Sequence, residues 1–137
     1  MINSTCMILK DSLYTIVSQQ QDDSSVLFCV RIHPEWPIYE AHFPRHPITP
    51  GVCIIQMVQE LLQELQSSDP RLRSVENRLR LIRAKHVKYV SIISPEEVTE
   101  ILVTFLKIDP QPDGCVKVQA EVSSGEKLYT KLSAIFC

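Results

Sequence analysis

The sequence predicts an α+β fold in which an antiparallel β-sheet wraps around one long central α-helix. The segment from Val52 to Gln66 has the one strong helical periodicity in the chain. Six other segments have the composition of strands, and turn signals rather than further helices separate them. This order favours an antiparallel sheet over a βαβ repeat. The length of 137 residues predicts a single domain, residues 1–137.

The strands are expected in two groups, one before and one after the helix. The first group is Met7 to Val17 and Val26 to Ile32, and the second of these strands ends at His33-Pro34. Asp109 to Gly114 and Ser123 to Glu126 are turn signals in the second group. The strands of that group are expected at Leu79 to Ile93, Val98 to Ile108, Val116 to Val122 and Lys127 to Cys137.

The helix is expected to begin at Pro50-Gly51 and to end before Ser67-Ser68-Asp69-Pro70. Its apolar residues recur at helical spacing and form one broad face: Ile54, Ile55, Val58, Leu61, Leu62 and Leu65. A polar stripe of glutamines lies beside that face: Gln59, Gln63 and Gln66. This pattern predicts a helix that buries one side against the sheet.

The composition is typical of a soluble globular protein, with 45% hydrophobic and 22% charged residues and a net charge of −2. This charge balance gives no support for nucleic-acid binding. No apolar stretch is long enough to predict a membrane span. The N-terminus lacks the basic and apolar regions of a signal peptide, so we expect it to belong to the mature protein.

The five cysteines predict neither a disulfide framework nor a zinc site. Their number is odd, the sequence has no C-x-x-C, and most of them lie in apolar runs where cysteine behaves as a small hydrophobe. This pattern favours the reducing cytoplasm as the location of the protein.

A proline-rich segment directly precedes the helix. It runs from His33 to Pro50 and contains five prolines, which restrict the backbone and predict a stiff loop. A rigid loop of this length holds side chains in one place, as catalysis requires. His42 and His46 are four residues apart, but Pro44 between them opposes a helix, so we expect no metal site. Both histidines can also serve only to hold the shape of the loop.

The start of the helix adds a second chemical feature to this loop. Gly51 lies where backbone N–H groups have no partner within the helix and where the helix dipole favours negative charge. A carbonyl oxygen that gains negative charge during a reaction would be stabilised there. His42 as a base beside such an oxyanion site is therefore a plausible catalytic pair.

The stretch HFPRHPITPGVCIIQMVQE, residues 42–60, resembles the signature of the 3-hydroxyacyl-[acyl-carrier-protein] dehydratases of the hot-dog fold (FabZ-like). That signature reads approximately H-F-P-G-H-P-[ILV]-x-P-G-V-[LM]-x-[LIV]-E-A-x-x-Q. Two histidines, three prolines and one glycine match in type and spacing. The later stretch KHVKYVSIISPEEV is similar to a weaker strand-and-turn segment of the same family, with Pro95-Glu96-Glu97 in place of its Pro-Gly-Asp.

The resemblance implies a hot-dog fold, a dimer whose sheets join edge to edge, and active sites at the dimer interface. The implied reaction removes water from a 3-hydroxyacyl chain and leaves a trans-2-enoyl thioester. The implied partner is an acyl carrier protein, whose phosphopantetheine brings the substrate, so no cofactor is expected. His42 matches the residue that takes the α-proton, and Gly51 matches the backbone donor to the thioester carbonyl. We expect Phe43, Arg45 and Val52 to contribute to substrate binding as well.

The helix acid of the family, which handles the departing hydroxyl group, should lie at position 56, where this chain has Gln56. An amide hydrogen-bonds to a hydroxyl group but supplies no acidic proton. The family usually has Gln four residues later, where this chain has Glu60, so E-x-x-x-Q has become Q-x-x-x-E. Since residues i and i+4 are neighbours on a helix, one hypothesis is that Glu60 supplies the acid, directly or through water or Gln56. The alternative is that Glu60 is a solvated helix residue.

Other residues each have two interpretations. Arg45 replaces a glycine of the signature and either contacts the phosphopantetheine phosphate or lies on the surface. Cys53, in the first helical turn, is either a nucleophile or, as we expect, a packed cysteine. The basic residues between positions 71 and 88 either dock an acidic carrier protein or protect a strand edge: Arg71, Arg73, Arg78, Arg80, Arg83, Lys85 and Lys88.

Three functions remain open from the sequence. The first is a dehydratase with a rearranged helix acid, as a homodimer or higher oligomer. The second is a catalytically impaired acyl-binding or partner subunit, which forms a heterodimer with an active homologue. The third and weaker alternative is an acyl thioesterase, since related hot-dog enzymes hydrolyse thioesters with a helix carboxylate. The H-F-P-x-H-P loop argues against this last option.

Overall fold

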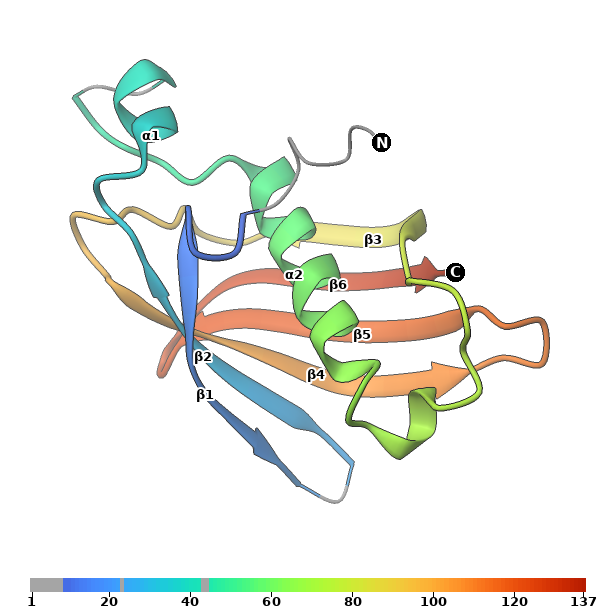
Figure 1. Ribbon diagram of the computed structural model, residues 1–137. Helices are drawn as coiled ribbons and strands as arrows, with labels where there is room; N and C mark the ends of the chain where they lie inside the picture. The colour runs from blue at the N-terminus through green and yellow to red at the C-terminus, as the bar shows by residue number, and fades with distance from the viewer. Residues whose placement is uncertain (1–8, 23, 43–44) are drawn as a thin grey trace.

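The computed structural model describes residues 9–22, 24–42 and 45–137, and it consists of one antiparallel sheet with a long helix across one face (Figure 1). The six strands follow the order β1-β2-β4-β5-β6-β3 in the sheet. They are β1 (Tyr14–Gln21), β2 (Val26–Ile32), β3 (Leu81–Tyr89), β4 (Glu100–Pro110), β5 (Val116–Ser124) and β6 (Lys127–Phe136). The helices are α1 (Pro37–His42), the long α2 (Gly51–Leu65) and the 3₁₀ helix η2 (Pro70–Leu72). The predicted α+β class is confirmed.

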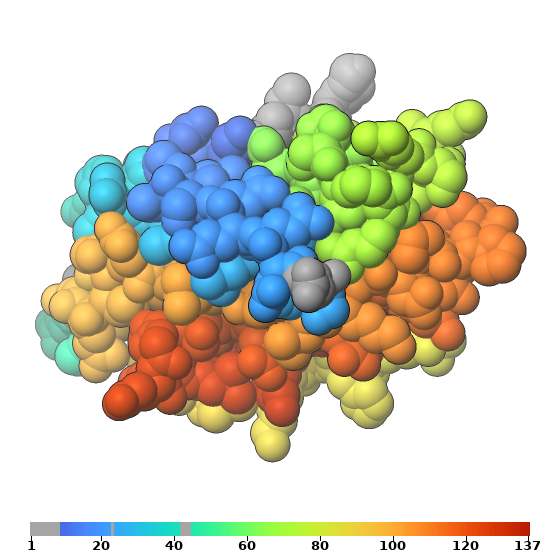
Figure 2. Space-filling model, turned by 90° about the horizontal axis from the view of Figure 1, so that it is seen from below, coloured from blue at the N-terminus to red at the C-terminus, as the bar shows by residue number. Residues whose placement is uncertain are grey.

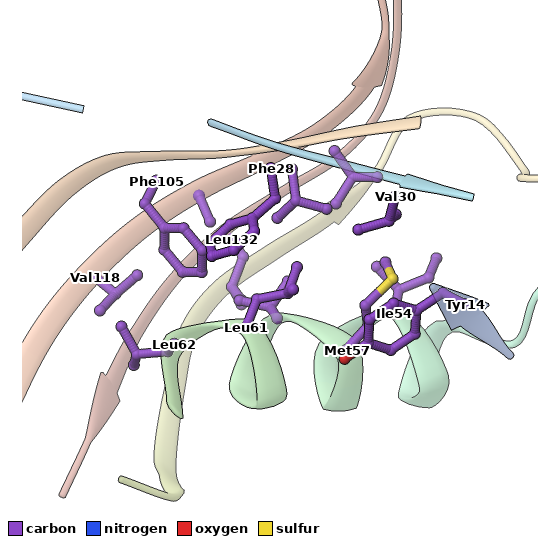
Figure 3. Close-up of a cluster of buried hydrophobic side chains, with 14 of the residues drawn as sticks. Tyr14, Phe28, Val30, Ile54, Met57, Leu61, Leu62, Phe105, Val118 and Leu132 are labelled. Carbon is purple, nitrogen blue, oxygen red and sulfur yellow. The ribbon is translucent and has the colours of Figure 1, made fainter. Parts of the chain in front are cut away.

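Helix α2 packs on the sheet through the face that its periodicity predicts (Figure 3). Leu61 and Leu62 are fully buried and point towards aromatic and aliphatic residues of the strands. Phe28 of β2 and Phe105 of β4 meet edge to face, with ring centroids 6.0 Å apart. Met57, which the apolar pattern of the sequence left out, is also fully buried, whereas Ile55 is only half-buried. Burying such side chains stabilises the fold by about 1.5–3 kcal/mol each.

The first two strands lie beside the central strands and cover the core on that side. In the view from below, β1 and β2 (blue) adjoin the orange segments of the later strands and the green end of α2 (Figure 2). The pairing of β2 with both β1 and β4 accounts for this position. No helix in the described ranges is long and apolar enough to cross a membrane.

The glutamine stripe of α2 binds the chain that leads into β3. Gln59 Oε1 accepts a hydrogen bond from Leu81 N (2.7 Å), and the amide of Gln63 donates to Leu79 O (2.7 Å). Gln66 accepts from Leu79 N and donates to Asn77 O, both over 2.8 Å. These side chains thus satisfy backbone groups that a sheet would otherwise pair, and they fix the start of β3 on the helix.

Several strand boundaries differ from the prediction. β1 begins at Tyr14 rather than at Met7, which lies outside the described residues. Asp11 has a left-handed φ of 66°, and the N–H groups of Ser12 and Leu13 bond back to Leu9 O, so the chain turns just before β1. β3 ends at Tyr89 rather than at Ile93, because the next two N–H groups both bond to the carbonyl oxygen of Tyr129.

The segment from His33 to Pro50 is not a loop throughout, contrary to the prediction. It contains the helix α1, whose last residue is His42. Pro37 is its first residue, a position where proline is well tolerated because the missing N–H would have no helical partner. The helix ends two residues before Pro44, in agreement with the expectation that a helix does not continue towards His46.

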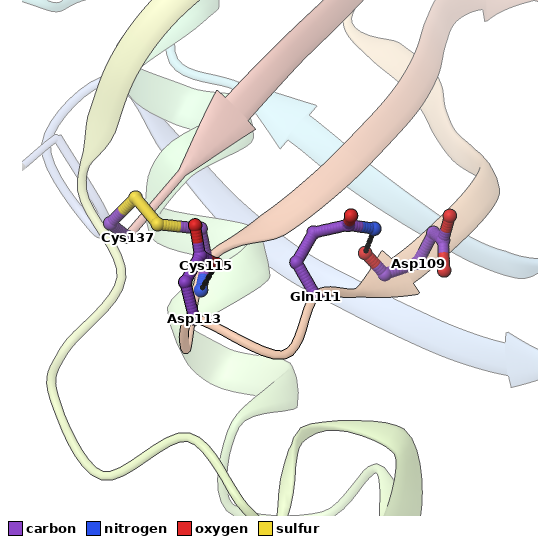
Figure 4. The surroundings of a disulfide bond; sticks show 5 residues. All are labelled: Asp109, Gln111, Asp113, Cys115 and Cys137. Carbon is purple, nitrogen blue, oxygen red and sulfur yellow. Dashed lines mark hydrogen bonds between the residues drawn. A yellow bond between two sulfur atoms is a disulfide. The ribbon is translucent and has the colours of Figure 1, made fainter.

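The structure contains a disulfide bond between Cys115 and Cys137, which the sequence analysis did not predict (Figure 4). Strands β5 and β6 form a hairpin in which Val116 pairs with Phe136, so the two flanking cysteines come together. Cys29 and Cys53 have free thiols. The cysteine pattern therefore gives no argument for a reducing compartment, and the cytoplasmic location stays a prediction.

Candidate functional site

Buried polar and aromatic contacts hold α1 against the start of α2. The hydroxyl groups of Tyr39 and Thr49 are 2.7 Å apart, and both residues are buried. Trp36 packs edge to face on Tyr39, with ring centroids 5.4 Å apart. Thr49 N also donates to Ile93 O (2.8 Å), which ties the segment before α2 to the chain after β3. Burial raises the pKa of Tyr39 to about 12, so its hydroxyl stays protonated at neutral pH.

The predicted loop residues are only partly within the described structure. His42 is the last residue of α1, but its side chain and the whole of Phe43 lie outside the described residues. Arg45 and His46 are exposed. In the described part of the chain, no three histidine, cysteine, aspartate or glutamate side chains gather in a way that could hold a metal ion.

Helix α2 begins as the sequence predicts, at Gly51 after Pro50, and the N-cap residue Pro50 supplies no side-chain hydrogen bond to it. The first N–H groups of the helix have no partner within it. Val52 is 67% exposed in the first turn, so the structure leaves both predicted binding residues at the helix start near solvent. Cys53 is half-buried, and burial raises the pKa of its thiol, which opposes its use as a nucleophile.

Tyr89, which the sequence analysis did not single out, lies directly against Gly51. A Cβ atom placed on Gly51 would lie 2.6 Å from Cζ and 2.7 Å from the hydroxyl oxygen of Tyr89. These distances are too short for any residue larger than glycine unless the ring moves. Tyr89 ends β3, far from Gly51 in the sequence, so only the sheet order brings the two residues together.

Gln56 and Glu60 do share one face of α2, as the i, i+4 spacing predicts. The amide of Gln56 donates to Glu60 Oε2 over 3.0 Å. Gln56 is half-buried and Glu60 is buried. The interpretation of Glu60 as a solvated helix residue is therefore wrong.

The carboxylate of Glu60 is occupied by the N-terminal segment of the chain. Leu9 N donates to Oε2 (2.8 Å), while Lys10 N and the hydroxyl of Tyr14 each donate to Oε1 (2.9 Å). With Gln56, four donors surround the carboxylate, which acts toward them only as an acceptor. Burial and the charge of Glu60 raise the pKa of Tyr14 far above its usual value, so its hydroxyl remains a donor.

An open cavity of about 840 Å³ lies along this face of α2, beside Gln56 and Glu60. Most of its lining residues are polar or charged, with the glutamine stripe on one side and the chain leading into β3 on the other. Lys10 reaches from the N-terminal segment to Glu64 over 2.5 Å at this cavity, and this bond raises the pKa of Lys10. Gln56 and Glu60 therefore border an open cavity, although Glu60 itself is buried.

Comparisons with known proteins identify relatives of this architecture. The family model described as ApeI dehydratase (ApeI-like) matches residues 18–127. The 3-hydroxyacyl-[acyl-carrier-protein] dehydratase FabZ of Lactococcus lactis, from strains MG1363 and IL1403, is 25% identical over 124 residues. This alignment covers 88% of the chain and 79% of the relative.

Solved structures share the fold at low sequence identity. The dehydratase heterocomplex ApeI:P from Xenorhabdus doucetiae has a TM-score of 0.62 and 15% identity, covering 90% of this chain and 96% of that one. The conserved protein PA5202 from Pseudomonas aeruginosa has a TM-score of 0.63 and 15% identity, covering 99% and 94%. These likenesses establish the hot-dog fold, and the match of the family model over residues 18–127 shows that the chain belongs to the ApeI-like family of FabZ-related hot-dog dehydratases.

Proposed function

We propose that this protein dehydrates 3-hydroxyacyl thioesters carried by acyl carrier protein, in fatty-acid or related lipid or polyketide synthesis. The main support is its family, together with the join between α1 and α2. That join sets His42 at the end of one helix and Gly51 at the start of the next, with the connecting segment held by the Tyr39–Thr49 bond. The named activity of the FabZ relatives is the same reaction class.

In the proposed reaction, His42 removes a proton from C2 of the acyl chain. The N–H of Gly51 binds the thioester carbonyl oxygen, on which negative charge develops, and the helix dipole adds to this stabilisation. The C2–H electron pair forms the C2=C3 double bond, and the C3–O bond breaks. The hydroxyl group takes up a proton and leaves as water. Phe43, Val52 and Arg45 would line the path of the substrate around these groups.

The proton for the departing hydroxyl group needs an acid, and Gln56 is not one. Glu60 is the candidate four residues later, acting directly or through water or Gln56. Its four donors set a condition on this role: a protonated Glu60 must release at least one of them. Either a side-chain donor, Gln56 or Tyr14, or the backbone of the N-terminal segment would therefore have to move away from the carboxyl group during turnover.

The variant Glu60→Gln tests this role. If Glu60 is the acid, turnover by the folded variant is lost, whereas Tyr14→Phe, which keeps the carboxylate and removes one donor, retains activity. Glu60→Gln with full activity would end the acid hypothesis. Circular dichroism of both variants verifies that the comparison is between folded proteins.

We further propose that the carrier protein docks on the basic segment between positions 71 and 88. Arg71 is tied to Asp69, but the other six basic residues are exposed. Carrier proteins are acidic, so docking of this kind should weaken as salt increases. Binding of the carrier protein that is unchanged between about 0.05 M and 0.5 M salt would exclude docking by this segment.

A second candidate is a subunit without full activity of its own, paired with an active homologue. The specific observation in its favour is that the helix acid is replaced by Gln56 while Glu60 is engaged in holding the N-terminal segment. The structurally similar ApeI:P assembly is by its name a heterocomplex. The exposed edge strand β3 suits either a second copy or a homologue.

One experiment separates the two candidates. Purified protein is given a 3-hydroxyacyl carrier-protein substrate, alone and with an active dehydratase homologue. Turnover by the protein alone that His42→Ala abolishes supports the enzyme. The partner subunit is supported if the protein alone shows no turnover and the mixture turns over substrate faster than the homologue alone. Hydrolysis of the thioester without dehydration would favour a thioesterase.

A further inference from the structure

We propose that Tyr89 is a substrate-binding residue whose hydroxyl group donates a hydrogen bond to the thioester carbonyl oxygen, next to the N–H of Gly51. This inference rests on the proposed function, because it places the thioester at the start of α2. It adds a residue that the sequence motif does not contain, contributed by the end of the edge strand β3.

The position of Tyr89 is the first reason. Its hydroxyl oxygen is 2.7 Å from the place that a Cβ atom of Gly51 would occupy. The side chain therefore borders the same residue whose N–H is expected to bind the carbonyl. A carbonyl oxygen bonded to that N–H would therefore sit on the residue that the phenol contacts. Figure 1 shows the end of β3 reaching the first turns of α2.

The surroundings of Tyr89 are the second reason. The residue is 51% exposed, and three apolar neighbours are exposed as well: Val52 at 67%, Val90 at 46% and Ile92 at 55%. Val52 follows Gly51, while Val90 and Ile92 follow Tyr89, so the four side chains belong to the two segments that meet at the helix start. Exposed apolar side chains in both segments, together with a hydroxyl group and a backbone donor, are features that suit an acyl thioester.

Gly51 itself is the third reason. The ring of Tyr89 lies so close that a Cβ atom at position 51 has no room, so this position of the ring requires a glycine there. A glycine here lets the ring of Tyr89 approach the start of the helix closely. Replacing Gly51 by alanine must displace the ring.

The test uses binding rather than turnover, so that it does not depend on the unknown acid. S-octanoyl-pantetheine has the thioester carbonyl but no 3-hydroxyl group and cannot be dehydrated. S-octyl-pantetheine, a thioether with the same number of chain carbons, lacks the carbonyl. Tyr89→Phe should weaken binding of the thioester roughly two- to tenfold, the effect of one neutral hydrogen bond, and leave binding of the thioether unchanged. Tyr129→Phe, whose hydroxyl group bonds to Ser124, is the matched control and should change neither.

A double-mutant cycle gives the second measurement. Gly51→Ala should weaken thioester binding in the parent protein, and it should do so less in a Tyr89→Ala background, where no ring is displaced. Equal effects of Gly51→Ala in both backgrounds, or equal weakening of thioester and thioether by Tyr89→Phe, would overturn the role of Tyr89 while the proposed function stands. A parent protein that binds neither ligand would overturn both.

Discussion

Gln56 donates a hydrogen bond to Glu60 one turn later on α2, over 3.0 Å. The amide and the carboxylate have the opposite order in the dehydratase signature that this chain resembles. The exchange places the carboxylate where three further donors, from Leu9, Lys10 and Tyr14, reach it. Glutamate, which serves as the acid in the related signature, thus has a further role in this chain: as Glu60, it holds the N-terminal segment on the helix.

Restoring an acid at position 56 should therefore destabilise the protein. Gln56→Glu removes a donor to Glu60 and sets two carboxylates one turn apart, which should lower the free energy of unfolding by about 1–3 kcal/mol. Urea denaturation measures this change. In the double variant Gln56→Glu/Glu60→Gln the pair is restored, so the two effects should not add. Strict additivity would contradict a direct contact between the two side chains.

The Tyr39–Thr49 bond should stabilise the join between α1 and α2. Tyr39→Phe leaves the buried Thr49 hydroxyl group without this partner and should cost about 1–3 kcal/mol. Adding Thr49→Val removes the unpaired group, and the double variant should recover part of that loss. Thermal unfolding tests both, and hydrogen exchange should show faster opening of residues 37–42 in Tyr39→Phe. If hydrogen exchange of residues 37–42 is the same in Tyr39→Phe and in the parent protein, the bond does not stabilise the position of α1.

Loss of the Cys115–Cys137 disulfide should lower the thermal stability. The bond joins residues 22 positions apart, for which the entropy of the closed loop predicts about 3 kcal/mol. Cys137→Ser and treatment of the parent protein with a reducing agent should therefore lower Tm to a similar extent. The variant Cys29→Ser changes a free thiol, so reductant should lower its Tm as much as that of the parent protein. A parent protein whose Tm is the same with and without reductant would contradict the contribution of the bond.

Asp69 should make stability depend on acid pH. Hydrogen bonds from Arg71, at 2.8–3.1 Å, hold the pKa of this carboxyl below its ordinary value of 3.8. As pH falls, the unfolded chain takes up a proton at Asp69 before the folded protein does, so stabilisation present at neutral pH is lost below about pH 4. Asp69→Asn should be less stable than the parent at pH 7, and the difference should shrink towards pH 2.5. A constant difference over that range would exclude this linkage.

Much of the fold could be predicted because it follows from local patterns. The spacing of Ile54, Val58, Leu61 and Leu65 predicts the buried face of α2, and alternation predicts strands close to those observed from Val26 onward. The boundary of β1 could not be predicted, because it depends on the turn at Asp11 and on the hold of Glu60 on Leu9 and Lys10. Such contacts join residues about fifty positions apart.

The candidate site divides in the same way. The sequence by itself determined the loop–helix motif with His42 and Gly51, the exchanged pair Gln56 and Glu60, and hence the family. The tertiary structure decided that Glu60 is buried among four donors, that Tyr89 lies on Gly51, and that two cysteines meet. The motif residues are neighbours in the chain, so their spacing fixes their chemistry. The other contacts depend on strand order and register, which arise only when the sheet closes around α2.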